Sequence, residues 1–291
     1  MTLVAVALAL LAAILFAAAS VAQHHVAAAD SGGSLVGRLA RSPLWWVGTF
    51  GDTAGFAMQA AALGVGSLLL VQPLLVTTLL FALPLGAGWA GRRVTRAEWG
   101  AALVLVASLA VFVVIGDPTA GLDRAPARDW MPTGTVLAVI VAGCVAVALL
   151  RRGTARALSL GVAAGMAFGV AAALVKGVVD LLGDGPVAVL TSWETWVLVL
   201  AVAGGTAAQQ WSYSAGELSA SLPAVTVGEP VVAAVIGLLV LGETIRADGP
   251  EWVLIGLTVA VMVAATISLA RSSARPRAGS TSITTATGGP A

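Results

Sequence analysis

The feature that most constrains this chain is a succession of nine long apolar runs. Each run is about as long as the ~20 residues that an α-helix needs to cross the hydrocarbon core of a bilayer. Apolar residues make up 59% of the chain and charged residues only 10%, which is too little polarity to cover a water-soluble fold. We therefore predict an all-α membrane protein with nine transmembrane helices. The runs lie at residues 3–22, 44–63, 66–90, 99–116, 133–150, 158–182, 195–213, 219–242 and 252–270.

Charge and motif content argue against several functional classes. The formal net charge is +1, so the chain lacks the basic field that a nucleic-acid partner requires. Its single cysteine, Cys144, lies in an apolar run and rules out both an internal disulfide and a cysteine-based metal site. The sequence has no phosphate-binding loop, no HExxH pair and no nucleophile elbow. We therefore expect neither an enzyme nor an ATP-driven pump, with no cofactor and no metal site.

Basic residues sort to one side of the predicted nine-span bundle. The other side carries only Arg124, Arg128 and Arg246, among most of the acidic loop residues. By the positive-inside rule, the protein lies in the cell membrane with its N-terminus outside and its C-terminus cytoplasmic. Residues 272–291 are rich in Ser, Thr, Gly and Pro and predict a disordered cytoplasmic tail. The sorted residues are Arg38, Arg41, Arg92, Arg93, Arg96, Arg151, Arg152, Arg156, Arg271, Arg275 and Arg277.

Three short motifs recur in the same order in the two halves of the chain. In this register the second to fourth helices correspond to the seventh to ninth. An odd offset of five helices inserts the second copy upside down, as in the inverted repeats of many secondary transporters. The alternative is similarity that arises from biased composition alone. The motif pairs are residues 51–54 with 204–207, Gln72-Pro73 with Glu229-Pro230, and Glu98-Trp99 with Glu251-Trp252.

The repeat divides the chain into three predicted parts. Residues 1–150 form a first transmembrane repeat of five helices, and residues 158–271 form a second repeat of four. The fifth helix has no counterpart, because a tenth helix is missing. The two repeats are therefore inverted-topology copies in a 5+4 arrangement, followed by the tail at 272–291.

Two segments carry a resemblance to a known superfamily. Residues 219–264, SASLPAVTVGEPVVAAVIGLLVLGETIRADGPEWVLIGLTVAVMVA, resemble the second half of EamA-like members of the drug/metabolite transporter superfamily. Residues 45–87 are similar to its NIPA-like magnesium-transporter branch, which has a tryptophan-led second helix with a Gly-acid pair, here Gly51-Asp52. The resemblance covers residues 1–271 and implies a transporter fold, with nine helices and an outward N-terminus as in that branch. It leaves the substrate open, because the superfamily carries many cargoes.

Two acidic residues lie near the middle of predicted spans. Glu229 is in the eighth run and Asp52 in the second. A charged group at the bilayer centre costs ~2.5–3.5 kcal/mol on insertion scales, so we expect both carboxyls to face the bundle interior. There they either load and release a proton or together hold a hard cation through oxygen ligands. The structural alternative is that each acid caps or hydrogen-bonds a neighbouring helix.

Prolines interrupt the same regions. Pro73 and Pro230 each remove a backbone hydrogen bond, and each frees a carbonyl one turn earlier, near Leu69 and Thr226. Such carbonyls are tolerated at membrane depth where they line a cavity or find a partner. We therefore predict helix breaks at both prolines, with a harmless kink as the alternative.

Other polar residues within the spans fit either a small polar substrate or hydrogen bonding between helices. Lys176 and Asp180 are four residues apart on one face of a helix. We expect an internal ion pair or a snorkelling lysine there, with a contact to substrate as the alternative. The remaining candidates for binding a substrate or coupling ion are Gln59, Gln72, Gln209, Gln210 and Tyr213.

Three functions remain open at this point. The first is a secondary transporter that moves a small solute by alternating access, and the second is a divalent-cation carrier for ions such as magnesium. The third is a non-transporting membrane protein of envelope assembly, against which the midplane acids weigh. The expected partners are a small-molecule or ion substrate, the lipid bilayer and, as the alternative to a monomer, a second copy of the chain in a homodimer.

Overall fold

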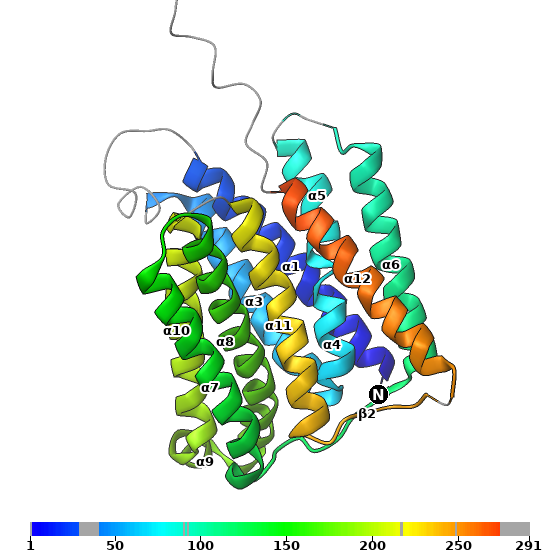
Figure 1. The fold of residues 1–291 in the computed structure, drawn as a ribbon, viewed down its shortest axis with the longest axis vertical. Helices are drawn as coiled ribbons and strands as arrows, with labels where there is room; N and C mark the ends of the chain where they lie inside the picture. Colours follow the sequence, from blue (N-terminus) through cyan, green and yellow to red (C-terminus); the bar gives the residue numbers. More distant parts are fainter. Residues whose placement is uncertain are drawn as a thin grey trace, which may run out of the picture.

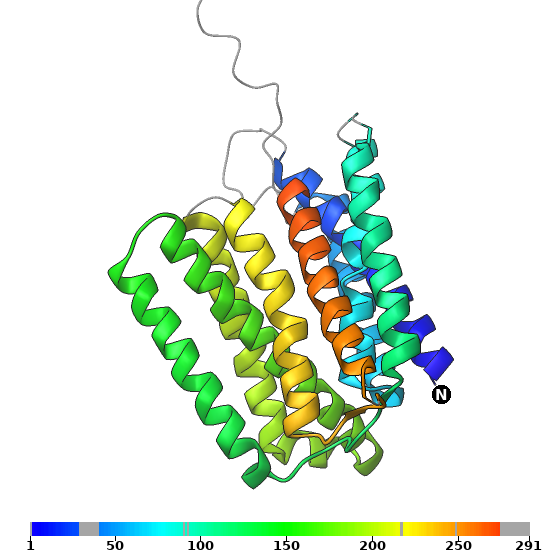
Figure 2. The same ribbon diagram turned by 45° about the vertical axis from the view of Figure 1, so that its right-hand side comes forward.

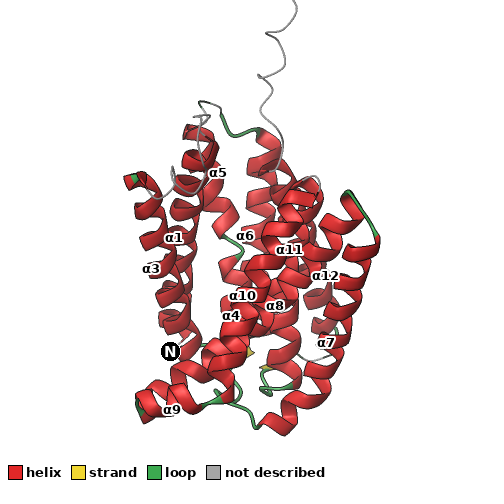
Figure 3. Ribbon diagram, turned by 90° about the vertical axis from the view of Figure 1, so that its left-hand side faces the viewer, coloured by secondary structure: helices red, strands yellow, loops and turns green. Residues whose placement is uncertain are grey.

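The computed structural model describes residues 2–28, 41–89, 91, 93–215, 218–247 and 249–273, and it shows a bundle of long helices (Figure 1). The long helices lie side by side between two common ends (Figures 1 and 3). In chain order the elements are α1 (Thr2–Ala28), α3 (Pro43–Val65), α4 (Leu68–Leu75), α5 (Thr78–Trp89), α6 (Arg96–Gly116), β1 (Pro118–Thr119), α7 (Ala127–Leu150), α8 (Thr154–Leu181), η1 (Leu182–Asp184), α9 (Pro186–Thr191), α10 (Trp193–Ala215), α11 (Leu218–Leu239), β2 (Thr244–Ile245) and α12 (Glu251–Ser273).

Among the described residues, seven helices, with α4 and α5 taken as one, are long and apolar enough to cross a membrane. The predicted all-α membrane protein is therefore confirmed. Helices α3 and α10 are 23 residues each but fall outside this group. They contain more polar residues, including Asp52 and Gln59 on α3 and Gln209 and Gln210 on α10. The nine-span count stays a prediction.

The two ends of the bundle differ in structure. One end carries β1, β2, η1 and α9 and is called here the β-bridge end; it is the lower end in Figure 1. The two strands pair antiparallel, with Pro118 opposite Ile245 and Thr119 opposite Thr244. The described arginines of the predicted cytoplasmic loops lie at the opposite end of the bundle. The tail from residue 274 falls outside the described residues, as do Arg38, Arg92, Arg275 and Arg277.

Helices early and late in the chain run in opposite directions between these ends (Figures 1 and 2). Helix α1 leaves the β-bridge end whereas α8 runs toward it, and the same reversal holds for α3 with α10, for α4–α5 with α11, and for α6 with α12. The largest helix contacts join α1 to α3 and α8 to α10. The early and late helices meet where α4 packs on α11 and α6 packs on α12.

Helix α8 lies at the centre of the late helices because it carries small residues where α11 crosses it. A Cβ atom added to Gly165 would lie 3.0 Å from the Gly228 Cα atom, and one added to Gly169 would lie 2.7 Å from the Glu229 carbonyl oxygen. Such close approach is typical of helix pairs packed through small residues in membranes. Helix α7, at the periphery in Figure 2, buries only Ala148 among its residues. The backbone around Glu229 is thus held by α8.

We expect Gly169→Ala to lower the thermal unfolding midpoint in detergent by several degrees. The added methyl group has no room beside the Glu229 carbonyl, and overpacking a close contact costs ~1–3 kcal/mol. Gly143→Ala on α7 is the matched control, because nothing lies within 4 Å of a Cβ atom there. Equal midpoints for the two variants, measured by differential scanning fluorimetry, would show that α8 and α11 are not packed this closely.

Candidate functional site

The span from Leu68 to Trp89 is broken into two helices. Helix α4 is only eight residues long and contains Pro73, and Val76 and Thr77 separate it from α5. At the break, the backbone N–H of Val76 donates to the Pro73 carbonyl at 3.2 Å, and the Thr77 hydroxyl donates to the Leu74 carbonyl at 2.6 Å. These short-range bonds replace the regular α-helical pattern. The structure thus has an interruption in this span three residues after Pro73.

The break predicted at Pro230 does not occur. Helix α11 is continuous from Leu218 to Leu239 although it contains both Pro223 and Pro230. A proline in a helix loses one backbone hydrogen bond but does not break the helix when its neighbours support it. Here the close packing on α8, at Gly165 and Gly169, supplies that support.

The N-terminus of α4 is capped by an acid from far along the sequence. Glu243 accepts hydrogen bonds from the backbone N–H groups of Leu68 (2.8 Å) and Leu69 (3.0 Å), and the Ser67 hydroxyl accepts one from Leu70 (3.1 Å). The Glu243 side chain is fully buried. A carboxylate here satisfies backbone donors that the helix leaves unpaired and opposes the positive end of the helix dipole.

The loop after α11 fits the Glu243 carboxylate closely against this helix. The backbone N–H of Glu243 donates to the Gly237 carbonyl at 2.8 Å, and this hydrogen bond folds the chain back on itself. A Cβ atom at Gly237 would lie 2.7 Å from Glu243 Oε2, so only glycine leaves room for the carboxylate.

Lys176 joins Glu243 to the solvent-facing Asp123. Its Nζ atom lies 3.2 Å from Glu243 Oε1 and 3.5 Å from Asp123 Oδ1. The Lys176 side chain is 1% exposed, whereas that of Asp123 is 57% exposed. Asp123, Lys176 and Glu243 are called here the buried ion cluster. The predicted pairing of Lys176 with Asp180 was wrong in its partner: Asp180 is exposed on α8, whereas Lys176 points into the bundle.

A second ion pair lies at the same end. Arg124 Nε donates to Glu194 Oε1 at 2.7 Å, and Glu194 is buried at the start of α10. This hydrogen bond is the main cause that raises the pKa of the Arg124 guanidinium, against an opposing effect of burial. The second oxygen of Glu194, Oε2, is buried and has no hydrogen-bond partner among the described residues.

The polar residues predicted from the sequence occupy several helices. Gln72 on α4 is 1% exposed, and its Nε2 atom has no hydrogen-bond partner in the described part of the chain. Gln59 is buried on α3, where Asp52 is partly buried. On α10, the Gln209 side chain hydrogen-bonds Tyr213, and Gln210 is exposed. Whether a substrate contacts these residues stays a prediction.

Glu229 lies midway along α11 and is partly exposed. No hydrogen bond or ion pair joins its side chain to any residue that the structure describes. It therefore differs from Glu243, whose carboxylate is fully engaged.

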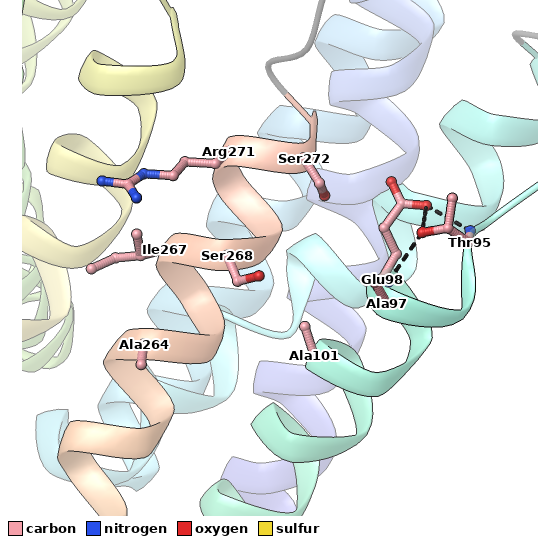
Figure 4. Close-up of a pocket in the computed structure, with 9 residues that line it drawn as sticks. All are labelled: Thr95, Ala97, Glu98, Ala101, Ala264, Ile267, Ser268, Arg271 and Ser272. Carbon is pink, nitrogen blue, oxygen red and sulfur yellow. Dashed lines mark hydrogen bonds between the residues drawn. The ribbon is translucent and has the colours of Figure 1, made fainter.

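A cavity of about 330 Å³ lies at the end away from the strands, between the start of α6 and the end of α12 (Figure 4). Glu98 faces it but also caps α6, accepting from the Thr95 backbone at 2.8 Å. Figure 4 shows Ser268 directed toward α6 and Arg271 directed away from it. None of the predicted binding residues lines this cavity. Within the described ranges, no group of three or more His, Cys, Asp or Glu residues is arranged to hold a metal ion.

The comparisons with known proteins identify a family but no activity. The chain is 37% identical over 281 residues to an uncharacterized protein of Corynebacterium glutamicum. The aligned region covers 94% of this chain and 97% of the corynebacterial protein. The chain belongs to the same family as this corynebacterial protein. No protein-family profile matches the sequence, and no solved structure matches it significantly.

The sequence did not predict that Glu243 and Asp123 belong to a buried ion cluster, because both were assigned to the outer loops. It also did not predict the ion pair of Arg124 with Glu194. One local signal was present, because Gly242-Glu243 closes the aliphatic run of the eighth span. An acid at that position is close enough to the helix ends to fold back into the bundle.

Proposed function

We propose that the protein is a secondary transporter that moves a small solute across the cell membrane by alternating access. The observation that carries the proposal is the broken span α4–α5. Residues Leu68–Leu74 of this span are buried within the bundle, and Gln72 among them presents an amide donor that no described residue satisfies. Discontinuous helices with unpaired polar groups are how many transporters build a substrate site near the midplane.

The helix directions support a bundle built from two inverted repeats. Each early helix has a late counterpart that runs the other way, and α1–α3 packing is matched by α8–α10 packing. Among the long helices that the structure describes, the peripheral α7 is left without a counterpart. Helices α3 and α10, at 23 residues, are about 35 Å long at 1.5 Å per residue and complete the proposed nine spans. Nine spans are also what the resemblance of residues 45–87 and 219–264 to drug/metabolite transporters implies.

Glu229 is proposed as the group that couples transport to an ion. An ionisable residue in a span is costly and normally marks an ion or substrate pathway. The alternative role as a structural hydrogen-bond acceptor loses support, because Glu229 accepts no hydrogen bond from any described residue. Its carboxyl is thereby available to load a proton or cation when the pathway opens.

The proposed orientation places the β-bridge end outside the cell. The arginine-rich opposite end then faces the cytoplasm, as the positive-inside rule requires. Reporter fusions after Arg96, after Arg156 and at the C-terminus should all read cytoplasmic. An external reading at any of the three sites would contradict the orientation.

The function is tested with purified protein in proteoliposomes, using a panel of small metabolites and divalent cations with and without a pH gradient. Glu229→Gln keeps the shape of the side chain but removes its titration, so gradient-driven uptake of the transported solute should fall about tenfold or more. Exchange that needs no coupling ion should survive. Asp129→Asn, an exposed acid at the start of α7, is the matched control and should transport normally.

Two results would count against the proposal. Normal gradient-driven uptake by Glu229→Gln would remove the coupling role of Glu229. Failure of the unsubstituted protein to move any solute of the panel would favour the non-transporting alternative, and uptake restricted to divalent cations would identify the cargo as an ion.

A further inference from the structure

Several contacts join early and late segments of the chain at the β-bridge end. The strand pair links Thr119 to Thr244, and the Leu122 N–H donates to the Leu241 carbonyl at 2.7 Å. Glu243 adds the contact from the loop after α11 to the start of α4. Each of these contacts must separate if the two halves move apart at this end.

We propose that the buried ion cluster is the gate that closes the transport path at the β-bridge end, and that it opens when Glu243 releases α4 and Lys176. The inference rests on the proposed function, because a gate requires a path behind it. It adds to that function the position of the closure and the residues that form it.

The cluster extends from the solvent into the bundle interior. Lys176 is buried, yet one of its two partners, Asp123, is exposed to solvent. One turn further into the bundle along α4 from Leu68 comes the unsatisfied amide of Gln72. A cavity lined by Asp123, Arg124 and Gly177 measures only about 10 Å³, hardly enough for one water molecule. Since the Lys176 and Glu243 side chains are themselves 1% and 0% exposed, the cluster leaves no room for a solute where these side chains meet.

The chemistry of the cluster suits a closure that can be reversed. An apolar plug of similar volume would give comparable or greater stability than a buried ion pair. Charged groups differ from such a plug because water hydrates them strongly when the pair separates, which lowers the free energy of the open state. A gate made of Lys176 and Glu243 can thus exist in a closed, paired form and an open, hydrated form.

Helix α4 is the element that can move. It is eight residues long, and the break at Val76 and Thr77 separates it from α5. The Glu243 contact holds its N-terminus, and its apolar side chains pack on α1 and α11. Loss of the Glu243 contact therefore removes the polar restraint on α4 and leaves only apolar packing to oppose its rotation about the break. A short segment with a hinge at one end and a releasable contact at the other is a two-state element.

The test measures access to Gln72 with a membrane-impermeant maleimide applied to the β-bridge side of the reconstituted protein. Cys144 is first replaced by alanine, so that Gln72→Cys supplies the one reactive thiol. The thiol should react slowly with the gate intact and about tenfold faster or more when Glu243→Gln is added, because the population shifts toward the open form.

Two controls separate gate opening from general loosening. Leu105→Cys probes a fully buried core position on α6 and should stay protected in the Glu243→Gln background. Glu194→Gln weakens the ion pair of Arg124 with the buried Glu194 at this end, which forms no hydrogen bond or ion pair with α4 among the described residues, and should leave Gln72→Cys protected. Labelling of Leu105→Cys as fast as that of Gln72→Cys would mean unfolding and would overturn the proposal.

A cross-link supplies an independent measurement. The hydroxyl oxygens of Thr119 and Thr244 are 2.6 Å apart on opposing strands, so Thr119→Cys with Thr244→Cys is suited to form a disulfide. When the disulfide is formed in the Glu243→Gln background, Gln72→Cys should regain its protection, and reduction should remove it again. Labelling is read at residue 72 by peptide mass spectrometry.

The gate is overturned if Gln72→Cys stays protected in Glu243→Gln, or if the cross-link leaves its labelling unchanged. Neither measurement needs a substrate. If the protein moved no solute of the panel but Gln72→Cys were labelled faster in Glu243→Gln, the proposed transport would be rejected and the opening at this end would remain. If uptake were seen but the labelling rate did not change, the gate would be rejected and the proposed transport would remain.

Discussion

The carboxylate of Glu243 at the start of α4 is the interaction on which the arrangement of this protein depends. An eight-residue helix is too short to persist alone, since isolated helices shorter than ~12–15 residues are marginal in water. Helix α4 also begins inside the bundle, where water does not reach its first backbone N–H groups. Ser67 satisfies one of these groups and Glu243 two others, at 2.8 and 3.0 Å. A residue from the loop after α11 thus stabilises the broken span α4–α5 among the early helices.

Helix α8 connects this polar contact to the rest of the bundle. One part of the helix packs through Gly165 and Gly169 against α11, where the backbones nearly touch. A later turn contributes Lys176, whose ammonium group neutralises Glu243 and lies against Asp123. Close packing between α8 and α11 resists movement, whereas an ion pair one contact from solvent can exchange its partner for water. The difference explains why we place movement at α4 and rigidity at the α8–α11 crossing.

The sequence predicted the helices well because bilayer thickness fixes the length of an apolar run, and each predicted run overlaps one long helix or, at 66–90, the broken pair α4–α5. The boundaries were less accurate, since the run 219–242 extends three residues past the end of α11 at Leu239. It did not predict which charged residues meet. Lys176 was paired with Asp180 by a local spacing rule, but its partner Glu243 is 67 residues away and is selected by burial. Pro73 and Pro230 look alike in sequence, yet only the former lies beside a break. Thr77 offers alternative hydrogen bonds there, whereas α8 supports α11.

The central claim is that Glu243 acts both as the cap of α4 and as the partner of Lys176, and a double-mutant cycle of thermal or chemical unfolding in detergent tests it most directly. Glu243→Ala leaves Lys176 buried without its main partner and two N–H groups unsatisfied, so we expect a loss of ~3–5 kcal/mol. Lys176→Met should cost less, because Glu243 keeps its two backbone donors. Adding Lys176→Met to Glu243→Ala should recover part of the loss, since the unpaired buried charge is removed. Strictly additive losses, or a larger loss from Lys176→Met than from Glu243→Ala, would contradict the claim.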